Sequence, residues 1–233
     1  MMKKVLVVLA MAALVAAAQA ALIDDFESYT VGTAPDGGWL HVTGAAENAT
    51  IGNDGDNYLE SRHSRIALPD GGIIAEGHTG IVSYEIYVPS DHNPDWSIGT
   101  SDVAAESATG SWSNFEAYIA VVGSPGASFT VNARNEGSNT FIGTITADAW
   151  HTVELVINNA TDTYDVYLDA ALLADDFKFR NGTTDAISTF KIYGREDGLT
   201  NRAGYVDNIA YTVPEPATMV LLGLGGLLLR RRK

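Results

Sequence analysis

The chain of 233 residues contains no cysteine, and only 14 of its residues are lysine or arginine. The absence of cysteine excludes a disulfide scaffold, a thiolate nucleophile and a zinc site with cysteine ligands. Residues 21–213 hold eight basic residues against 28 acidic ones, so this span carries a net charge of −20. A general nucleic-acid-binding protein is therefore excluded, because phosphate contacts need a surface of lysine and arginine. These 193 residues can bury one sizeable core, which predicts a single domain.

No sustained helical periodicity is present in this span. Short runs of alternating apolar and polar side chains recur instead, separated by glycine, asparagine and aspartate. Tyr84, Ile86 and Val88, for example, fall on one face of a strand. Residues 171–174 could form one helical turn. Many short strands predict an all-β sandwich or barrel. The expected strands cover residues 22–29, 39–43, 57–61, 80–88, 115–122, 128–134, 140–145, 152–158, 163–169, 189–195 and 205–212.

Residues 150–169 (WHTVELVINNATDTYDVYLD) predict a β-hairpin. Trp150 and His151 open its first strand, residues 158–162 form a polar turn, and the second strand ends at Asp169. The segment resembles a hairpin of laminin-G-like, concanavalin-A-type jelly rolls.

That resemblance extends over most of residues 21–212, because DDFESY at residues 24–29 and VDNI at residues 206–209 resemble the family's first and last strands. It implies a jelly-roll sandwich of two antiparallel sheets in which the terminal strands are neighbours. Ala170 stands where the family usually has glycine, so we expect a looser turn after Asp169.

Residues 1–20 predict a secretory signal peptide. Lys3 and Lys4 supply a positive start, residues 5–18 are apolar, and Ala18-Gln19-Ala20 offers small residues to signal peptidase. We expect cleavage after Ala20. The alternative is an uncleaved membrane helix, for which the apolar run is short.

Residues 213–233 consist of a proline-rich stop, 13 apolar residues and a basic end. A helix of that length spans about 20 Å, short of a hydrocarbon core of roughly 30 Å. We therefore expect transient membrane insertion, with the basic side chains at the cytoplasmic face. The stop is Val213, Pro214, Glu215 and Pro216, and the basic end is Arg230, Arg231, Arg232 and Lys233.

This order resembles the PEP-CTERM sorting signal of Gram-negative bacteria. In that family an exosortase, a membrane-embedded cysteine transpeptidase, processes the signal. The protein then goes to the outer surface or to the extracellular polymer matrix. The resemblance implies cleavage near residues 214–216 and a domain outside the cytoplasm. An ordinary membrane anchor with a coincidental Pro-Glu-Pro is the alternative.

Acidic residues stand at both ends of the domain. If the terminal strands are neighbours, Asp25 and Glu27 approach Asp207. Such carboxylates repel one another unless they are protonated or share a cation, and calcium prefers oxygen ligands. Related jelly rolls often hold a structural calcium between their terminal strands, so the resemblance implies a Ca²⁺ site at these three residues. The alternative is that they deter edge pairing. The acidic run at residues 53–57 is interpreted as a turn.

Two tryptophans lie in polar stretches, Trp96 in HNPDWSIG and Trp112 in TGSWSNF. A flat ring stacks on the apolar face of a sugar, and carboxylate or amide oxygens accept its hydroxyl protons. Trp96 and Trp112 are therefore the candidates for an exposed polysaccharide-binding platform, with loop packing as the alternative. Trp39 and Trp150 stand at strand starts and are expected at the edge of the core.

Motifs of a glycan-active enzyme are sparse. A retaining glycosidase needs two carboxylates about 5–5.5 Å apart, and no Glu-x-Asp-x-x-Glu pattern is present. Asp165 and Asp169 share a strand face, but the hairpin accounts for both. His63 with Arg62 and Arg65 would suit a polysaccharide lyase, and a salt-bridged surface is the alternative.

The sequence thus predicts an exported, exosortase-sorted protein of the cell surface or extracellular matrix with a non-catalytic jelly roll and no catalytic residues. Its acidic surface suits spacing among anionic polymers, bridged by divalent cations. A carbohydrate-binding module for an extracellular polysaccharide is the first alternative. A glycan-active hydrolase or lyase is the second.

Overall fold

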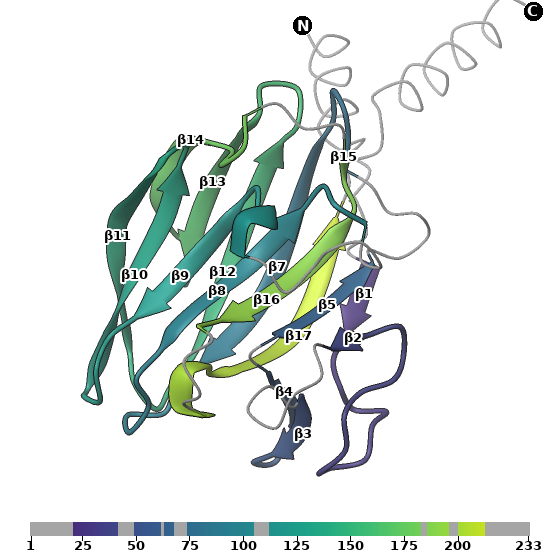
Figure 1. Ribbon diagram of the computed structural model, residues 1–233, viewed down its shortest axis with the longest axis vertical. Helices are drawn as coiled ribbons and strands as arrows, with labels where there is room; N and C mark the ends of the chain where they lie inside the picture. The colour runs from purple at the N-terminus through teal and green to yellow at the C-terminus, as the bar shows by residue number, and fades with distance from the viewer. Residues whose placement is uncertain are drawn as a thin grey trace, which may run out of the picture.

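The computed structural model describes residues 21–41, 49–61, 63–67, 74–104, 112–182, 186–195 and 200–212. The predicted signal peptide and the predicted sorting signal lie outside these ranges. Within them, two antiparallel sheets pack face to face (Figure 1), which confirms the predicted all-β sandwich. None of the helices in the described ranges has the length and apolar character needed to span a membrane.

The first sheet has the strand order β14-β13-β12-β7-β17-β4-β3, with β1 beside β17, and the second has the order β11-β10-β9-β8-β16-β5-β2. A small third sheet joins β6 and β15. The strands are β1 (Ala21–Asp24), β2 (Leu40–His41), β3 (Thr50–Asn53), β4 (Asn57–Glu60), β5 (His63–Ala67), β6 (Ile74–Ala75), β7 (Thr79–Tyr87), β8 (Asp95–Ser101), β9 (Tyr118–Val122), β10 (Ser128–Asn135), β11 (Ser138–Thr146), β12 (Trp150–Asn158), β13 (Thr163–Leu168), β14 (Ala171–Lys178), β15 (Ala186–Ile187), β16 (Thr189–Gly194) and β17 (Tyr205–Thr212). Two short 3₁₀ turns, η2 (Trp112–Asn114) and η3 (Thr200–Arg202), interrupt the connections.

The terminal strands β1 and β17 pair antiparallel, as the jelly-roll resemblance implies. The predicted first strand ends early, at Asp24 instead of Tyr29. Phe26 has a positive φ of 58°, and the Asp24 carboxylate accepts hydrogen bonds from the Phe26 N–H at 2.9 Å and from Trp39 Nε1 at 2.7 Å. This buried carboxylate closes a turn, so the chain leaves the sheet.

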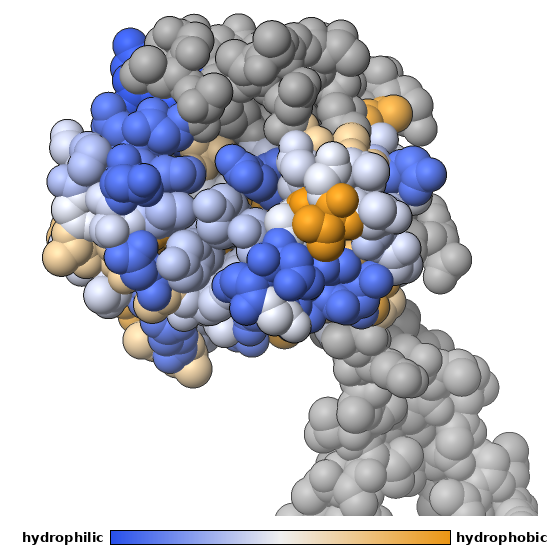
Figure 2. All heavy atoms as spheres, turned by 90° about the horizontal axis from the view of Figure 1, so that it is seen from below, coloured by the Kyte–Doolittle hydropathy of each residue, from blue (hydrophilic) through white to orange (hydrophobic). Residues whose placement is uncertain are grey.

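The lower end of the sandwich has a mainly hydrophilic surface on which strongly apolar groups are isolated (Figure 2). Such a surface agrees with the large excess of acidic residues in the domain. A net charge far from zero keeps an exported domain soluble.

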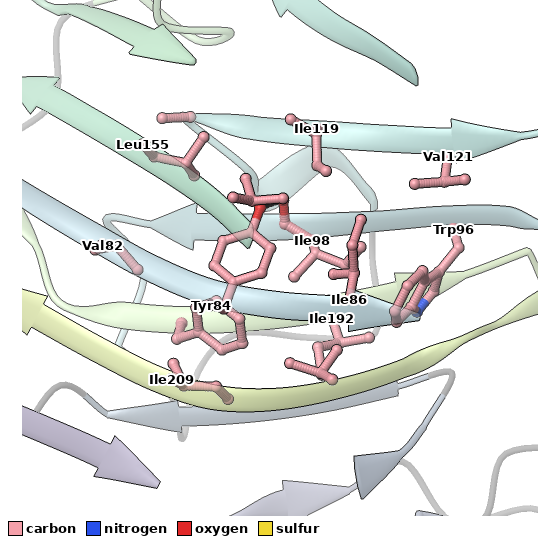
Figure 3. Close-up of a cluster of buried hydrophobic side chains, with 14 of the residues drawn as sticks. Val82, Tyr84, Ile86, Trp96, Ile98, Ile119, Val121, Leu155, Ile192 and Ile209 are labelled. Carbon is pink, nitrogen blue, oxygen red and sulfur yellow. Dashed lines mark hydrogen bonds between the residues drawn. The ribbon is translucent and has the colours of Figure 1, made fainter. Parts of the chain in front are cut away.

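The core lies between the two sheets, where every second side chain of each strand points inward (Figure 3). The predicted alternation in β7 is confirmed, with Tyr84 fully buried. Its hydroxyl donates to the Ile98 carbonyl at 3.1 Å, and Trp96 Nε1 donates to the Ser61 carbonyl at 3.2 Å. These two large side chains between the sheets are thus hydrogen-bonded, which removes the cost of burying their polar atoms.

The predicted hairpin is confirmed as β12 paired with β13. The turn that follows is tight rather than loose, because Leu168 pairs directly with Ala171 across two residues. Asp169 and Ala170 have φ values of 49° and 64°, the left-handed pair that a short hairpin turn requires. Residues 171–174 belong to strand β14, so the helical turn considered there is wrong.

Replacing Ala170 with glycine is expected to stabilise the protein. The left-handed conformation costs alanine about 1–2 kcal/mol, and glycine adds roughly 0.5–1 kcal/mol of unfolded-state entropy. The net gain in the free energy of unfolding is therefore about 0.5–1 kcal/mol in urea denaturation. Ala171→Gly is the matched control, because Ala171 is an exposed strand residue where glycine should destabilise. A lower stability for Ala170→Gly would contradict the strained turn.

Candidate functional site

Side chains from five strands line up across the outer face of the second sheet. The register aligns Phe141 of β11 with Asn132 of β10, and then with Ala120, Ser97 and Tyr193 of β9, β8 and β16. Since the alternate residues of these strands fill the core, this row points away from it. The row begins with Phe141, which is 63% exposed.

The connection between β8 and β9 folds back onto this face and covers its centre. Phe115 packs against Tyr118 with ring centroids 4.9 Å apart, and Ala120 completes a small apolar cluster. Trp112 and Tyr193 pack at the border of that cluster and are half-buried. Trp112 therefore lies beside the open β10–β11 part of the face.

Two arginine side chains lie over the Trp112 ring. The guanidinium carbon of Arg180 is 3.6 Å from the ring centroid and that of Arg134 is 5.2 Å from it. Arg180 also donates a hydrogen bond to the Trp112 carbonyl. Arg134 donates to the Glu136 carbonyl at 2.8 Å and to Asn139 Oδ1 at 3.1 Å. Planar guanidinium groups stack well on an indole, so the three side chains form one cationic and aromatic cluster.

Glu116 holds this cluster in place from below. Its carboxylate accepts hydrogen bonds from the backbone N–H and the side-chain amide of Asn181, and its carbonyl accepts the Arg180 N–H at 3.2 Å. Burial raises the pKa of this carboxyl to about 7, against the lowering effect of the Asn181 bonds. Glu116 thus ties the segment that carries Trp112 to the segment that carries Arg180. Sequence reasoning missed it, because a single glutamate before a strand has no distinguishing pattern.

The expectation of an exposed platform at Trp96 is wrong. Trp96 lies on the inward face of β8 and is fully buried. Trp112 is half-buried, and a guanidinium group occupies a face of its ring. Trp39 is buried, as expected. Trp150 lies instead on the outer face of the first sheet, with its ring centroid 5.5 Å from that of Tyr87.

The terminal acids do come together around Asp207. Asp207 is 3% exposed, and burial raises the pKa of its carboxyl to about 7, with Asp56, Glu85 and Glu27 adding repulsion. The Glu27 pKa is also raised, chiefly by a hydrogen bond with the Asp56 carboxyl. Asp25 accepts the Glu27 N–H at 3.2 Å and stays at the edge of the group. Asp56 belongs to the turn at residues 53–57, which connects β3 and β4 as predicted.

The donor set around Asp207 consists of oxygens, which suits a hard cation. Within the described ranges, however, no three histidine or acidic side chains converge in a geometry that would hold a metal ion. The structure therefore gathers the predicted calcium ligands without arranging them as a finished coordination shell.

The residues considered for catalysis have other surroundings. The Asp165 carboxylate accepts a backbone N–H of β14, and the Asp169 carboxylate accepts one of β12. His63 and Arg65 lie in β5, opposite Tyr193 and Lys191 of β16. Arg62 and the side chains of His63 and Arg65 lie outside the described part of the chain. Among the described residues that the sequence singled out, no two carboxylates form a pair of the kind that a glycosidase needs.

Known proteins resemble this chain in two separate regions. The family model of the PEP-CTERM protein-sorting motif matches residues 212–233. No curated protein sequence matches the chain. Among solved structures, a sialidase has a TM-score of 0.56 at 12% identity, covering 85% of this chain and 19% of its own. The present chain thus spans about a fifth of that sialidase.

Two smaller proteins match over nearly their whole length. The carbohydrate recognition domain of Emp47p has a TM-score of 0.53 at 11% identity, over 84% of this chain and 98% of its own. An endo-β-1,4-glucuronan lyase from the fungus Trichoderma reesei has a TM-score of 0.50 at 13% identity, over 82% and 100%. At such identities the likeness concerns the fold alone. The C-terminal motif, in contrast, is specific: the chain carries a PEP-CTERM sorting signal, which indicates an exported protein that an exosortase processes.

The buried Glu116 carboxyl predicts a particular dependence of stability on pH. Its folded pKa of about 7 lies above the ordinary value of a glutamate, so the folded state prefers the protonated form. Its contribution to stability is present at pH 4 and is lost as the pH rises through 7. Glu116→Gln should therefore flatten the fall in urea midpoint between pH 5 and 8. An unchanged slope would place an ordinary, solvated carboxylate at this position.

Proposed function

We propose that this exported protein is a non-catalytic component of the surface or matrix of a Gram-negative bacterium, and that its domain binds polysaccharide on the open β10–β11 part of the outer face of the second sheet. The carrying observation is the exposed Phe141 in register with Asn132 and beside the Trp112 cluster. Sugar recognition needs apolar rings for the pyranose faces and amide groups for the hydroxyls.

The position of Phe141 supports this proposal. An aromatic ring that is 63% exposed gains little from the core, and it stands at the open side of the sheet with Asn132 and Asn139 nearby. Leu172, another exposed apolar side chain, lies on β14 of the first sheet, on a different sheet from Asn132 and Asn139. A sheet face also offers a rigid base, which lowers the ordering cost of binding an extended polymer.

A binding role without catalysis agrees with the carboxylates that the structure describes near this face. Glu116 is buried and hydrogen-bonded to Asn181, and Glu136 pairs with Lys178 at 3.0 Å. Neither belongs to an exposed carboxylate pair with the spacing of a glycosidase.

A structural calcium remains a second proposal, supported by the burial of Asp207 among like charges. Glu27, Asp56 and Asp207 would have to move closer together to supply its carboxylate oxygens, with Asp25 at the edge, because the described residues do not hold them as a metal-binding group. Calcium would offset the repulsion that adds to burial in raising the pKa of Asp207. It would also join the two ends of the domain, since Glu27 follows β1 and Asp207 belongs to β17.

Polysaccharide binding is tested with residues 21–212, which contain every described strand and the whole described core. In gels containing xylan, hydroxyethylcellulose, alginate or polygalacturonate, at least one polymer should retard the domain. Phe141→Ser and Trp112→Ala should each weaken that binding about tenfold, which equals about 1.4 kcal/mol.

Leu172→Ser is the control, because it removes an exposed apolar side chain from the other sheet. Incubation with the bound polymer should release neither new reducing ends nor an unsaturated product. Retardation by none of the four polymers, or equal losses for Leu172→Ser and Phe141→Ser, would refute the proposed face.

The calcium proposal predicts a change in thermal unfolding between EDTA and millimolar Ca²⁺. At 100 times its dissociation constant, a ligand stabilises the folded state by about 2.7 kcal/mol, a shift of a few degrees at this size. Asp207→Asn should abolish the shift, whereas Asp175→Asn, an exposed residue of β14, should keep it. If Ca²⁺ leaves the midpoint of the unmodified domain unchanged, the terminal acids act as edge protection instead.

A further inference from the structure

The cluster around Trp112 brings together two cations that form no ion pair with a carboxylate of the described residues. Within the described ranges, Lys178 and Arg195 form ion pairs with acidic side chains. The guanidinium groups of Arg134 and Arg180 donate instead to neutral carbonyl and amide oxygens. This is unexpected in a span with 28 acidic and eight basic residues, where nearly every cation could find a carboxylate.

The two guanidinium groups also repel each other. Burial lowers the pKa of Arg180, and the charge of Arg134 lowers it further, although Tyr118 and Glu116 act in the opposite direction. Holding two like charges over one indole costs free energy unless an anion neutralises them. A guanidinium fork binds a carboxylate through two parallel hydrogen bonds, which makes such an anion the natural complement.

A buried hydroxyl beside the pair lacks an acceptor. Tyr118 is fully buried on β9, and the charges of Arg180 and Arg134 both act on its phenol. In the part of the chain that the structure describes, no oxygen accepts the proton of this hydroxyl. A buried donor without an acceptor is uncommon in native proteins, and here it lies directly beneath the Trp112 cluster.

From this arrangement we propose that the polysaccharide is acidic and that Arg134 and Arg180 bind the carboxylates of its uronate residues. The inference rests on the proposed function, because it names the chemical class of ligand for the same face. It also gives Trp112 a different role from a sugar platform. The indole holds the guanidinium groups by stacking, while Phe141 remains the open ring for a pyranose.

The other charges nearby agree with this role. The Glu116 carboxyl acts on Arg180, and its oxygens accept hydrogen bonds from Asn181. Lys191 lies with its Nζ 5.0 Å from the Phe115 ring centroid and adds a further cation to the same sheet. The rest of the domain is strongly acidic, so an anionic polymer would be repelled elsewhere and held at this cluster.

The experiment compares two ligands with the same sugar backbone, polygalacturonate and its fully methyl-esterified, uncharged form, by affinity electrophoresis of residues 21–212. The acidic polymer should bind at least tenfold more tightly. Arg134→Gln and Arg180→Gln should each reduce that binding at least tenfold. Arg195→Gln is the matched control, because it removes the same charge from an exposed pair with Asp95 and should leave the affinity unchanged.

The outcomes separate this inference from the proposed function. If both polymers bind equally, and Phe141→Ser weakens binding while the arginine variants do not, polysaccharide binding survives and the acidic class is overturned. If neither these polymers nor the neutral ones bind, both fail. Should Arg180→Gln fail to fold, Arg134→Gln decides the matter, because among the described residues the Arg134 guanidinium hydrogen-bonds to the Glu136 carbonyl and to Asn139, both close to it in the chain.

Discussion

The packing of two antiparallel sheets face to face is the constraint on which the rest of this structure depends. Because side chains alternate along a strand, each residue that fills the core assigns its neighbours to the outer face. In β10, Phe129, Val131 and Ala133 are buried, so Asn132 and Arg134 point outward. The choice of residues that fill the core therefore also decides which side chains stand on the outer face. A shift of the strand register by one residue would exchange the two sets.

Charge is distributed unevenly over the domain, with a cationic cluster in one place and a group of carboxylates in another. The domain is poor in cations, yet two of them gather over Trp112 on a buried support made by Glu116 and Asn181. Elsewhere, carboxylates gather around the buried Asp207 between the first and last strands. Each group of like charges is unfavourable by itself, and each would gain stability from an ion of opposite sign.

Much of the fold could be predicted because it depends on local patterns. The alternation in β7 and the β12–β13 hairpin follow directly from residue order. The burial of Trp96 could not be predicted, because its neighbours Ser97 and Gly99 are small residues typical of loops. These small residues lie in a strand, and the β8–β9 connection packs over Gly99, where an added Cβ would meet the Ala117 carbonyl and Tyr118. No residue pattern within β8 predicts that a connection packs over it.

Length, charge, the C-terminal sorting motif and the all-β class are properties of the sequence by itself, because composition and period-2 alternation need no knowledge of distant contacts. Tertiary structure decided which aromatic rings are open and which cations meet. Trp112 and Arg180 are 68 residues apart, and only the return of the chain after β14 places the guanidinium group over the indole. Likewise, the charge of Glu27 acts on Asp207 because the first and last strands pair. The physical reason is that these contacts join segments whose separation is set by sheet topology rather than by neighbouring residues.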